Sequence, residues 1–164
     1  MSFPNTVSFP IPIDFPKQAP VQPPRLRWAF PPLSRCVLSN GLTLVVMEER
    51  RLPMVQVRLM IPGGRRMEAF SQARGVTGLA MRCARYGTAN HDAAGLALAL
   101  DGLGSHVACR ASLDAVSFAA QSLSGNLDAS MGLLSDVLLS PSFDPVETER
   151  EIGKIVAAKR QQGK

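Results

Sequence analysis

Prolines divide the chain into two parts that differ in what they can fold into. Nine of the 13 prolines lie between Pro4 and Pro32, where they alternate with aromatic residues. Proline lacks a backbone N–H and disfavours helical backbone in the residue before it, so this segment cannot form a helix. We expect residues 1–33 to be an extended arm, either a disordered leader or a strap whose aromatic side chains dock on a partner or on the rest of the chain. A folded domain is expected over residues 34–164.

After residue 33, apolar and polar residues alternate in short runs, which is typical of half-buried strands. Arg35–Leu38 and Leu42–Met47 flank Asn40-Gly41, a pair that accepts the positive φ angles of a two-residue turn. We therefore predict a tight hairpin. In a third run, Met54–Ile61, branched aliphatic residues alternate with polar ones, so one face of the sheet is expected to be buried.

The rest of the chain carries apolar residues at helical spacing and two further strand patterns. The order of three strands, two helices, two strands and two helices predicts an α+β fold, a mostly antiparallel sheet covered on one face by helices. The predicted elements are a helix between Gly75 and Tyr86, a helix from an Asn90 cap to Gly102 or Gly104, strands His106–Ala111 and Ala115–Ala120, a helix Leu127–Leu139, and a helix from Pro145 to the chain end.

Composition limits the class of protein. Hydrophobic residues make up 46% of the 164 residues, which is enough for a core and too much for a wholly disordered chain. The net charge is +5, but the arginines between Arg50 and Arg85 are not interleaved with aromatic residues, as a platform for stacking bases would be. We therefore expect no nucleic-acid partner.

Cysteine spacing and hydropathy set the expected compartment. Three widely spaced cysteines form no Cys-x-x-Cys pair, so neither a disulfide framework nor a zinc knuckle is predicted. No apolar run reaches the roughly 18–20 residues that cross a bilayer, and the first residues show neither a secretory signal nor a transit-peptide pattern. We expect no membrane span and, by default, a cytoplasmic location.

Several phrases of the sequence occur in an order that identifies a family. They are Leu38-Ser39-Asn40-Gly41-Leu42, then Gly64, Arg66 and Glu68, then Gly75-Val76 with Tyr86-Gly87-Thr88, then Leu103-Gly104, and finally Phe143-Asp144-Pro145 with Glu149-Arg150-Glu151. Together they resemble the N-terminal domain of the pitrilysin/insulinase family of zinc metallopeptidases, which includes the mitochondrial processing peptidase. The resemblance covers roughly Arg35 to Arg160 and implies the family's α+β domain, here incomplete at its C-terminal end.

The resemblance also implies a metal site that this chain has lost. Active members carry the inverted motif His-x-x-Glu-His on the framed helix, where two imidazoles one turn apart hold zinc and the glutamate takes a proton from the bound water. Gly78, Met81 and Arg82 stand at these positions, and Ala158 stands at the position of the third protein ligand. Glu151, which resembles a supporting carboxylate, remains and is expected to be a solvated charge. We therefore expect no catalytic residues and no zinc.

Other catalytic or metal-binding arrangements find little support in the sequence. His91 and His106 are 15 residues apart and lack further ligands at suitable spacing beyond Asp92. His106 and Cys109 are three residues apart on a predicted strand, so their side chains face opposite sides and cannot form a dyad. Cys83 lies on the apolar stripe of its helix, where a free cysteine acts as a small hydrophobic residue.

These observations lead to a function expected from the resemblance: a non-catalytic homologue that serves as a partner subunit or scaffold. It would form a hetero-oligomer with an active family subunit, or a homo-oligomer, and would help to enclose peptide. Two alternatives stay open, an active zinc endopeptidase with unrecognised ligands and a family fragment without independent function. The expected peptide-facing edge is the strand of His106, Val107, Ala108, Cys109, Arg110 and Ala111, where Ala108-Cys109 replaces the family's Asn-Ala phrase.

Overall fold

The structure is a computed structural model that describes residues 31–70 and 74–162. The predicted proline-rich arm, residues 1–33, lies outside the described residues except for its last three. The chain divides into two units, one ending at Glu49 and the other beginning at Arg50, and each is described by itself.

In the first unit, β1 (Leu33–Val37) and β2 (Thr43–Met47) form an antiparallel hairpin. The predicted two-residue turn is wrong, because the N–H of Leu38 still donates to the carbonyl of Leu42 (2.8 Å), which leaves a three-residue loop. Gly41 has φ +84° at the end of that loop, the left-handed position that a three-residue hairpin loop requires. The turn residues were identified correctly, but the loop length was not.

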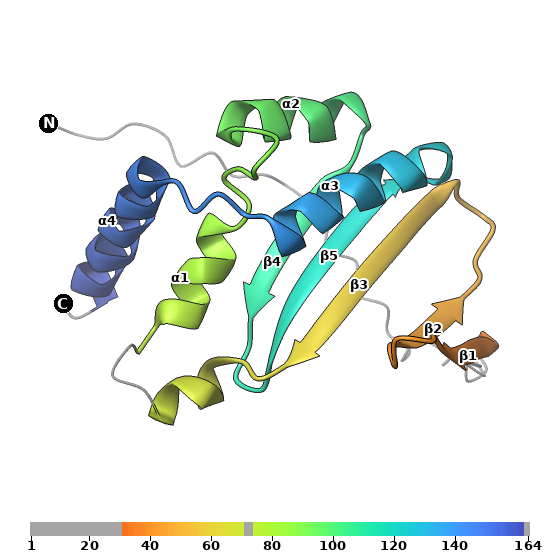
Figure 1. Ribbon diagram of the computed structural model, residues 1–164, viewed down its shortest axis with the longest axis horizontal. Coiled ribbons are helices and arrows are strands. Elements are labelled where there is room, and N and C mark those ends of the chain that lie inside the picture. Colours follow the sequence, from red (N-terminus) through yellow and green to blue (C-terminus); the bar gives the residue numbers. More distant parts are fainter. Residues whose placement is uncertain (1–30, 71–73, 163–164) are drawn as a thin grey trace, which may run out of the picture. The chain divides into compact units, whose positions relative to one another are not determined.

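The second unit is built on a three-stranded antiparallel sheet. Its strands are β3 (Met54–Pro62), β4 (His106–Ala111) and β5 (Ala115–Leu123), and the order β3-β5-β4 puts β5 in the centre (Figure 1). Leu59 and Cys109 both pair with Phe118, so the three side chains share one face. The predicted alternation in β3 is confirmed as far as Leu59, which packs on the core from this face, but Ile61 at the end of the strand is exposed and not buried as expected.

Four α-helices and two short 3-10 helices complete the unit. The α-helices are α1 (Val76–Cys83), α2 (Ala93–Gly102), α3 (Leu127–Leu139) and α4 (Pro145–Gln162), and the 3-10 helices are η1 (Arg65–Phe70) and η2 (Ser124–Asn126). The predicted bounds of α3 are confirmed at both ends. Residues of α1, α2 and α3 share the hydrophobic core with the same face of the sheet, which confirms the predicted α+β fold with helices on one face.

The core is small and almost entirely aliphatic. Phe118 is its one buried aromatic residue among those described, and Leu96 and Val137 are 1% and 0% exposed. Burying a leucine or valine side chain of this kind contributes roughly 1.5–3 kcal/mol relative to leaving it in water. Helices α2 and α3 are therefore held mainly by their apolar contacts with the sheet.

The start of α2 differs from the prediction. Asp92, not Asn90, is the N-cap, and its Oδ1 accepts from the N–H of Gly95 at 2.7 Å. Asn90 is used elsewhere, because its side-chain amide donates to Asp136 of α3 at 3.1 Å. Two residues in this stretch could cap a helix, and contact with α3 decides between them.

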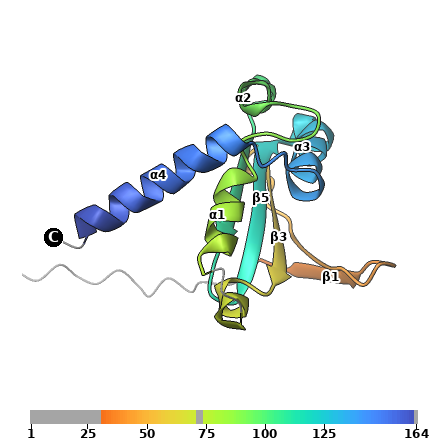
Figure 2. The same ribbon diagram turned by 60° about the vertical axis from the view of Figure 1, so that its left-hand side comes forward.

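Helix α4 lies apart from the sheet and packs against α1. Figure 2 shows the two helices close together at the C-terminal end of α1 and diverging toward the C-terminus of α4. Of the described residues of α4, only Glu151 is buried. The buried residue of this helix is therefore a carboxylate, which makes the α1–α4 contact the natural place to look for a site.

Candidate functional site

Helix α1 carries the positions at which the resemblance expects a zinc motif. Met81 packs against the hydrophobic core, whereas the side chain of Arg82 is 60% exposed and reaches α4. Gly78 is half-buried, and a Cβ added there would meet no atom within 4 Å. Packing thus leaves room for a larger side chain at residue 78, but the residues that are present offer neither an imidazole nor a carboxylate.

Glu151 is brought to the same place from α4. It is 2% exposed, and its Oε1 accepts a hydrogen bond from the hydroxyl of Tyr86 at 2.8 Å and from Nζ of Lys154 at 2.6 Å. Its Oε2 lies 3.7 Å from the guanidinium of Arg82. The expectation that Glu151 is a solvated charge is wrong, because its oxygens are occupied by groups from α1, α4 and the segment after α1.

The charges around Glu151 favour its ionised form. The hydrogen bond from Lys154 lowers the pKa of the carboxyl most, burial raises it, and the hydrogen bond from Tyr86 and the charges of Lys154 and Arg82 lower it further. The net pKa is below the ordinary value. A guanidinium and an ammonium therefore neutralise this carboxylate, where the resemblance expects it to support a metal.

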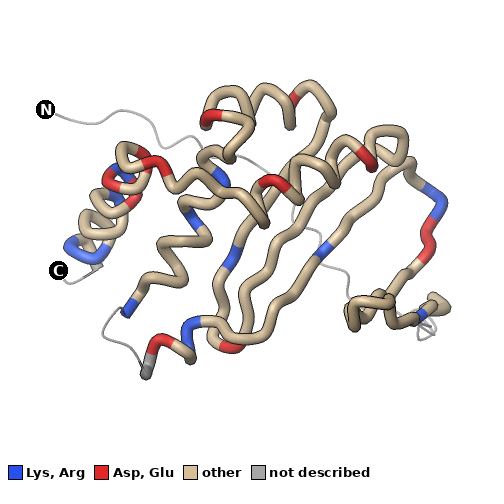
Figure 3. The backbone as a smooth tube through the Cα atoms, in the orientation of Figure 1, with Lys and Arg blue, Asp and Glu red and all other residues tan. Residues whose placement is uncertain are grey.

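Two cations also lie over the ring of Tyr86. The guanidinium of Arg85 is 5.3 Å from the ring centroid, and the ammonium of Lys154 is 5.7 Å from it. Figure 3 shows basic and acidic residues close together where α1 ends beside α4. Sequence analysis missed Lys154, although Glu151 and Lys154 are three residues apart on one helix, which is a recognisable ion-pair spacing.

The residues present do not fit a zinc ion. Ala158 lies on α4 seven residues beyond Glu151, or roughly 10 Å along the helix axis, and brings no ligand. No group of three or more histidine, cysteine, aspartate or glutamate side chains that could hold a metal ion occurs within residues 31–70 and 74–162. Arg82 adds a fixed positive charge beside the only carboxylate that the motif retains.

The segment before α1 fixes the helix that carries these positions. The carboxylate of Glu68 accepts from the backbone N–H groups of Gly75 and Thr77, both at 2.7 Å. These bonds satisfy N–H groups at the start of α1 that have no partner within the helix. A hydrogen bond from the side chain of Thr77 lowers the pKa of Glu68 most, and the two backbone bonds lower it further. The glutamate of the Gly-x-Arg-x-Glu phrase is thus a cap for α1, the helix that carries the candidate site.

The other two residues of that phrase hold the turn after β3. Gly64 has φ +40°, and a Cβ there would come within 2.5 Å of the backbone N of Ala115. Arg66 forms an exposed ion pair with Asp114 in the β4–β5 turn, with Nε and Oδ1 3.0 Å apart. Only glycine fits at residue 64, so this turn depends on it.

Two of the three thiols, those of Cys83 and Cys109, are unsuited to nucleophilic catalysis. Cys83 is 2% exposed, and burial raises the pKa of the Cys109 thiol to about 11, so this side chain stays protonated at neutral pH. His106 pairs with Gln121 and Cys109 with Phe118, so the two side chains are on opposite faces of the sheet, as predicted. The structure does not bring these two groups together.

Strand β4 lies at an edge of the sheet. Within the described residues it pairs with β5 alone, so its other side presents unpaired backbone N–H and C=O groups. His106 and Arg110 are exposed, Val107 is buried, and Ala108 and Cys109 are half-buried. The strand predicted to face peptide is therefore an edge strand, which is a requirement for that role but does not test it.

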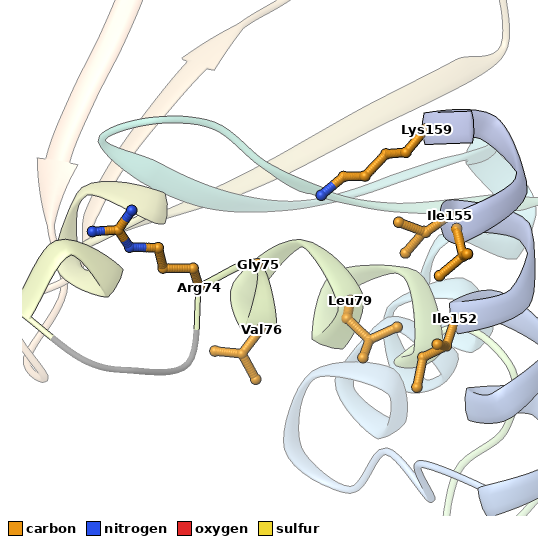
Figure 4. Close-up of a pocket in the computed structure, with 8 residues that line it drawn as sticks. Arg74, Gly75, Val76, Leu79, Ile152, Ile155 and Lys159 are labelled. Carbon is orange, nitrogen blue, oxygen red and sulfur yellow. The ribbon is translucent and has the colours of Figure 1, made fainter. Parts of the chain in front are cut away.

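A groove of about 300 Å³ opens where α1 and α4 diverge (Figure 4). Leu79 of α1 faces Ile152 and Ile155 of α4 across it, and Arg74 and Lys159 also line it. The groove is mainly apolar, with the two basic residues as its charged groups, and no carboxylate, histidine or thiol lines it.

The sequence matches a known family over most of its length. A profile described as Insulinase (Peptidase family M16) matches residues 44–162. This chain belongs to the insulinase family. No curated protein sequence is similar enough to count as a relative.

Solved structures share the insulinase-family fold. The chain is 24% identical to the peptidase M16 inactive domain from Pseudomonas fluorescens, with a TM-score of 0.74 over 80% of this chain and 32% of that one. It is 20% identical to a protease from Helicobacter pylori, with a TM-score of 0.65 over 81% of this chain and 32% of that one. The chain thus spans about a third of the length of each. The predicted family and fold class are confirmed.

None of the helices in the described part of the chain combines the length and hydrophobicity that crossing a bilayer requires.

Proposed function

We propose that this chain is a non-catalytic insulinase-family domain that acts as a partner subunit or scaffold for an active zinc peptidase subunit and helps to enclose peptide. The observation that carries the proposal is the contact of Arg82 with Glu151 at 3.7 Å. At the place of the second metal-binding imidazole, the chain puts a permanent cation and pairs it with the retained carboxylate.

The chemistry of these residues supports the absence of catalysis. Zinc peptidases need ligands for the metal and a base for its water. Gly78 has no side chain, Met81 cannot accept a proton, and Arg82 would repel a dication. An arginine that forms an ion pair with the neighbouring helix also stabilises the contact that the metal would otherwise bridge.

The edge position of β4 supports contact with peptide. An extended segment can add to such an edge through main-chain hydrogen bonds, and these need no metal. One of the two structural neighbours is itself described as an inactive domain of this peptidase family. We propose that peptide holding was kept when cleavage was lost.

Cleavage and association are tested on the full 164-residue chain. We expect no hydrolysis of a quenched fluorescent peptide library with zinc present, and we expect the tagged chain to co-purify with a protein that carries an intact His-x-x-Glu-His helix and holds zinc. Hydrolysis that a chelator abolishes would overturn the non-catalytic assignment. Co-purification without any such protein would overturn the partner role.

A further inference from the structure

Three cations and one buried carboxylate meet at the contact between α1 and α4. Arg82 and Lys154 approach Glu151, and Arg85 and Lys154 lie over the ring of Tyr86. We call these three cations the cationic cluster. Within these contacts the carboxylate of Glu151 balances one of the three positive charges.

The cations of the cluster are open to solvent, whereas the carboxylate is not. The side chains of Arg82 and Lys154 are 60% and 56% exposed, against 3% for that of Glu151. Arg82 approaches Glu151 no closer than 3.7 Å, which is longer than a hydrogen bond, so its N–H donors remain available. Arg85 is exposed, and the hydrogen bond from its guanidinium to the hydroxyl of Tyr86 is long, at 3.5 Å.

The cationic cluster lies beside the free edge of β4. Helix α1 packs against this strand, and the charge of Arg85 acts on the thiol of Cys109 in the middle of it, where it lowers the pKa against the effect of burial. A segment that added to the edge of β4 would run beside α1, which carries Arg82 in its last turn (Figure 1). Main-chain pairing and a charged subsite are therefore available to the same ligand.

We propose that the cationic cluster binds a carboxylate of an extended peptide seated on the edge of β4. This inference rests on the proposed function and adds to it the chemical class of the peptide, which is acidic. Guanidinium groups bind carboxylates through paired hydrogen bonds, so Arg82 and Arg85 would make the principal contacts. The ligand's carboxylate would balance positive charge of the cationic cluster that Glu151 alone does not neutralise.

Three fluorescein-labelled eight-residue peptides of threonine and valine test the ligand class by fluorescence anisotropy. The first has one central glutamate and an amidated C-terminus, the second has glutamine there and a free C-terminal carboxylate, and the third has glutamine and an amidated end. Binding of the first peptide only is expected for a side-chain carboxylate. Preference for the second would assign the site to a chain end, and equal binding of all three would overturn the proposal.

Substitutions locate the subsite. Arg82→Gln and Arg85→Gln are each expected to weaken binding of the glutamate peptide by roughly five- to twentyfold and to leave the neutral peptide unaffected. Arg58→Gln on β3 is the matched control, because it removes the same charge from an exposed position outside the cluster. Thermal unfolding of each variant shows whether the fold is kept. Equal effects of all three substitutions would contradict the assignment.

Salt separates a charged contact from main-chain pairing alone. Raising NaCl from about 0.05 M to about 0.5 M is expected to weaken binding of the glutamate peptide more than binding of the neutral one, because exposed charges are screened over a few ångströms at high salt. If no peptide binds but the chain still co-purifies with a zinc-bearing subunit, this inference fails and the proposed function stands. If the chain binds zinc and cleaves peptide, the proposed function fails first.

Discussion

At the scale of residues, the account depends on which polar groups are buried and what neutralises them. Glu151 is buried on a helix whose other described residues are not, and it contacts Tyr86, 65 residues away in sequence. Its partner Arg82 stands where the resemblance places a metal ligand. The carboxylate of Glu151 is the centre of an ion cluster that protein groups form among themselves.

Replacing Glu151 tests that cluster. The pKa of Glu151 is lowered in the folded chain, so the unfolded chain binds a proton at this carboxylate more readily. The stabilising effect of the ionised carboxylate is therefore fully present above the ordinary carboxyl pKa of about 4.3. It is lost as the pH falls through the lower pKa of the folded chain. Glu151→Gln is expected to lower the free energy of unfolding at neutral pH by roughly 1–2 kcal/mol. The free energy of unfolding should then decrease less between neutral and acidic pH in the variant than in the unmodified chain. Urea denaturation at neutral and acidic pH measures both effects.

Glu149→Gln is the control for this prediction, because residue 149 is exposed on the same helix. Matching unfolding curves for the two variants would show that the burial and the contacts of Glu151 contribute nothing to stability.

The three cysteines are expected to differ in reactivity. Cys36 is exposed, Cys83 is buried, and burial raises the pKa of Cys109 to about 11. The thiolate is the reactive form, so iodoacetamide should modify Cys36 first and the other two slowly, with Cys109 accelerated only at strongly alkaline pH. Peptide mass spectrometry after timed labelling measures the order. Fast labelling of Cys109 at neutral pH would contradict its described environment.

Alanine substitution at two glycines near the candidate site is expected to change stability in opposite directions. Gly64→Ala is expected to destabilise by about 2–4 kcal/mol, because φ is +40° and the new Cβ would lie 2.5 Å from the backbone N of Ala115. Gly78→Ala is expected to stabilise α1 by up to about 1 kcal/mol, because a Cβ there meets nothing within 4 Å and alanine favours helix. Thermal unfolding distinguishes them, and a stable Gly64→Ala variant would refute the described turn.

At the scale of elements, sequence patterns predict the parts that local chemistry decides. Leu127–Leu139 was predicted with both ends correct, because apolar spacing and Pro141 act within the segment itself. The start of α2 was wrong by two residues, because the hydroxyl of Thr88 and the carboxylate of Asp136 occupy the polar groups around Asn90. Contacts between elements decided that boundary, and they are invisible in a local pattern.

The candidate site likewise has a part that the sequence predicts and a part that depends on contacts between elements. The resemblance to a family placed Gly78, Arg82 and Glu151 together, and the structure brings Arg82 and Glu151 within 3.7 Å. The roles of Tyr86 and Lys154 could not be predicted, because they depend on how α4 crosses the end of α1. The burial of Glu151 follows from the same crossing, so periodicity on α4 alone suggested a solvated charge.

At the scale of the whole molecule, the chain consists of two units with different protection. Among the described residues, the strands β1 and β2 pair only with each other and are exposed throughout, whereas β5 is paired on both sides and covered by α3. A two-stranded hairpin alone is marginally stable in water. Hydrogen exchange followed by mass spectrometry is therefore expected to show fast exchange in β1 and β2 and slow exchange in β5. Equal protection of all three strands would show that the hairpin belongs to the same cooperative unit.

The chain also spans about a third of the length of the two solved structures named above. In the part of the chain that the structure describes, β4 is paired on one side only and a groove opens between α1 and α4, so the domain has surfaces for a partner. This agrees with the proposed role beside an active subunit, which the co-purification experiment tests.

The zinc content of the purified chain tests the central claim most directly. After dialysis against about 10 µM zinc and removal of loosely bound metal, native mass spectrometry is predicted to show the metal-free chain, because the residues that replace the inverted motif offer no ligand set. The variant with Gly78→His, Met81→Glu, Arg82→His and Ala158→Glu is the comparison for a restored site. About one tightly held zinc ion per unmodified chain would contradict the account.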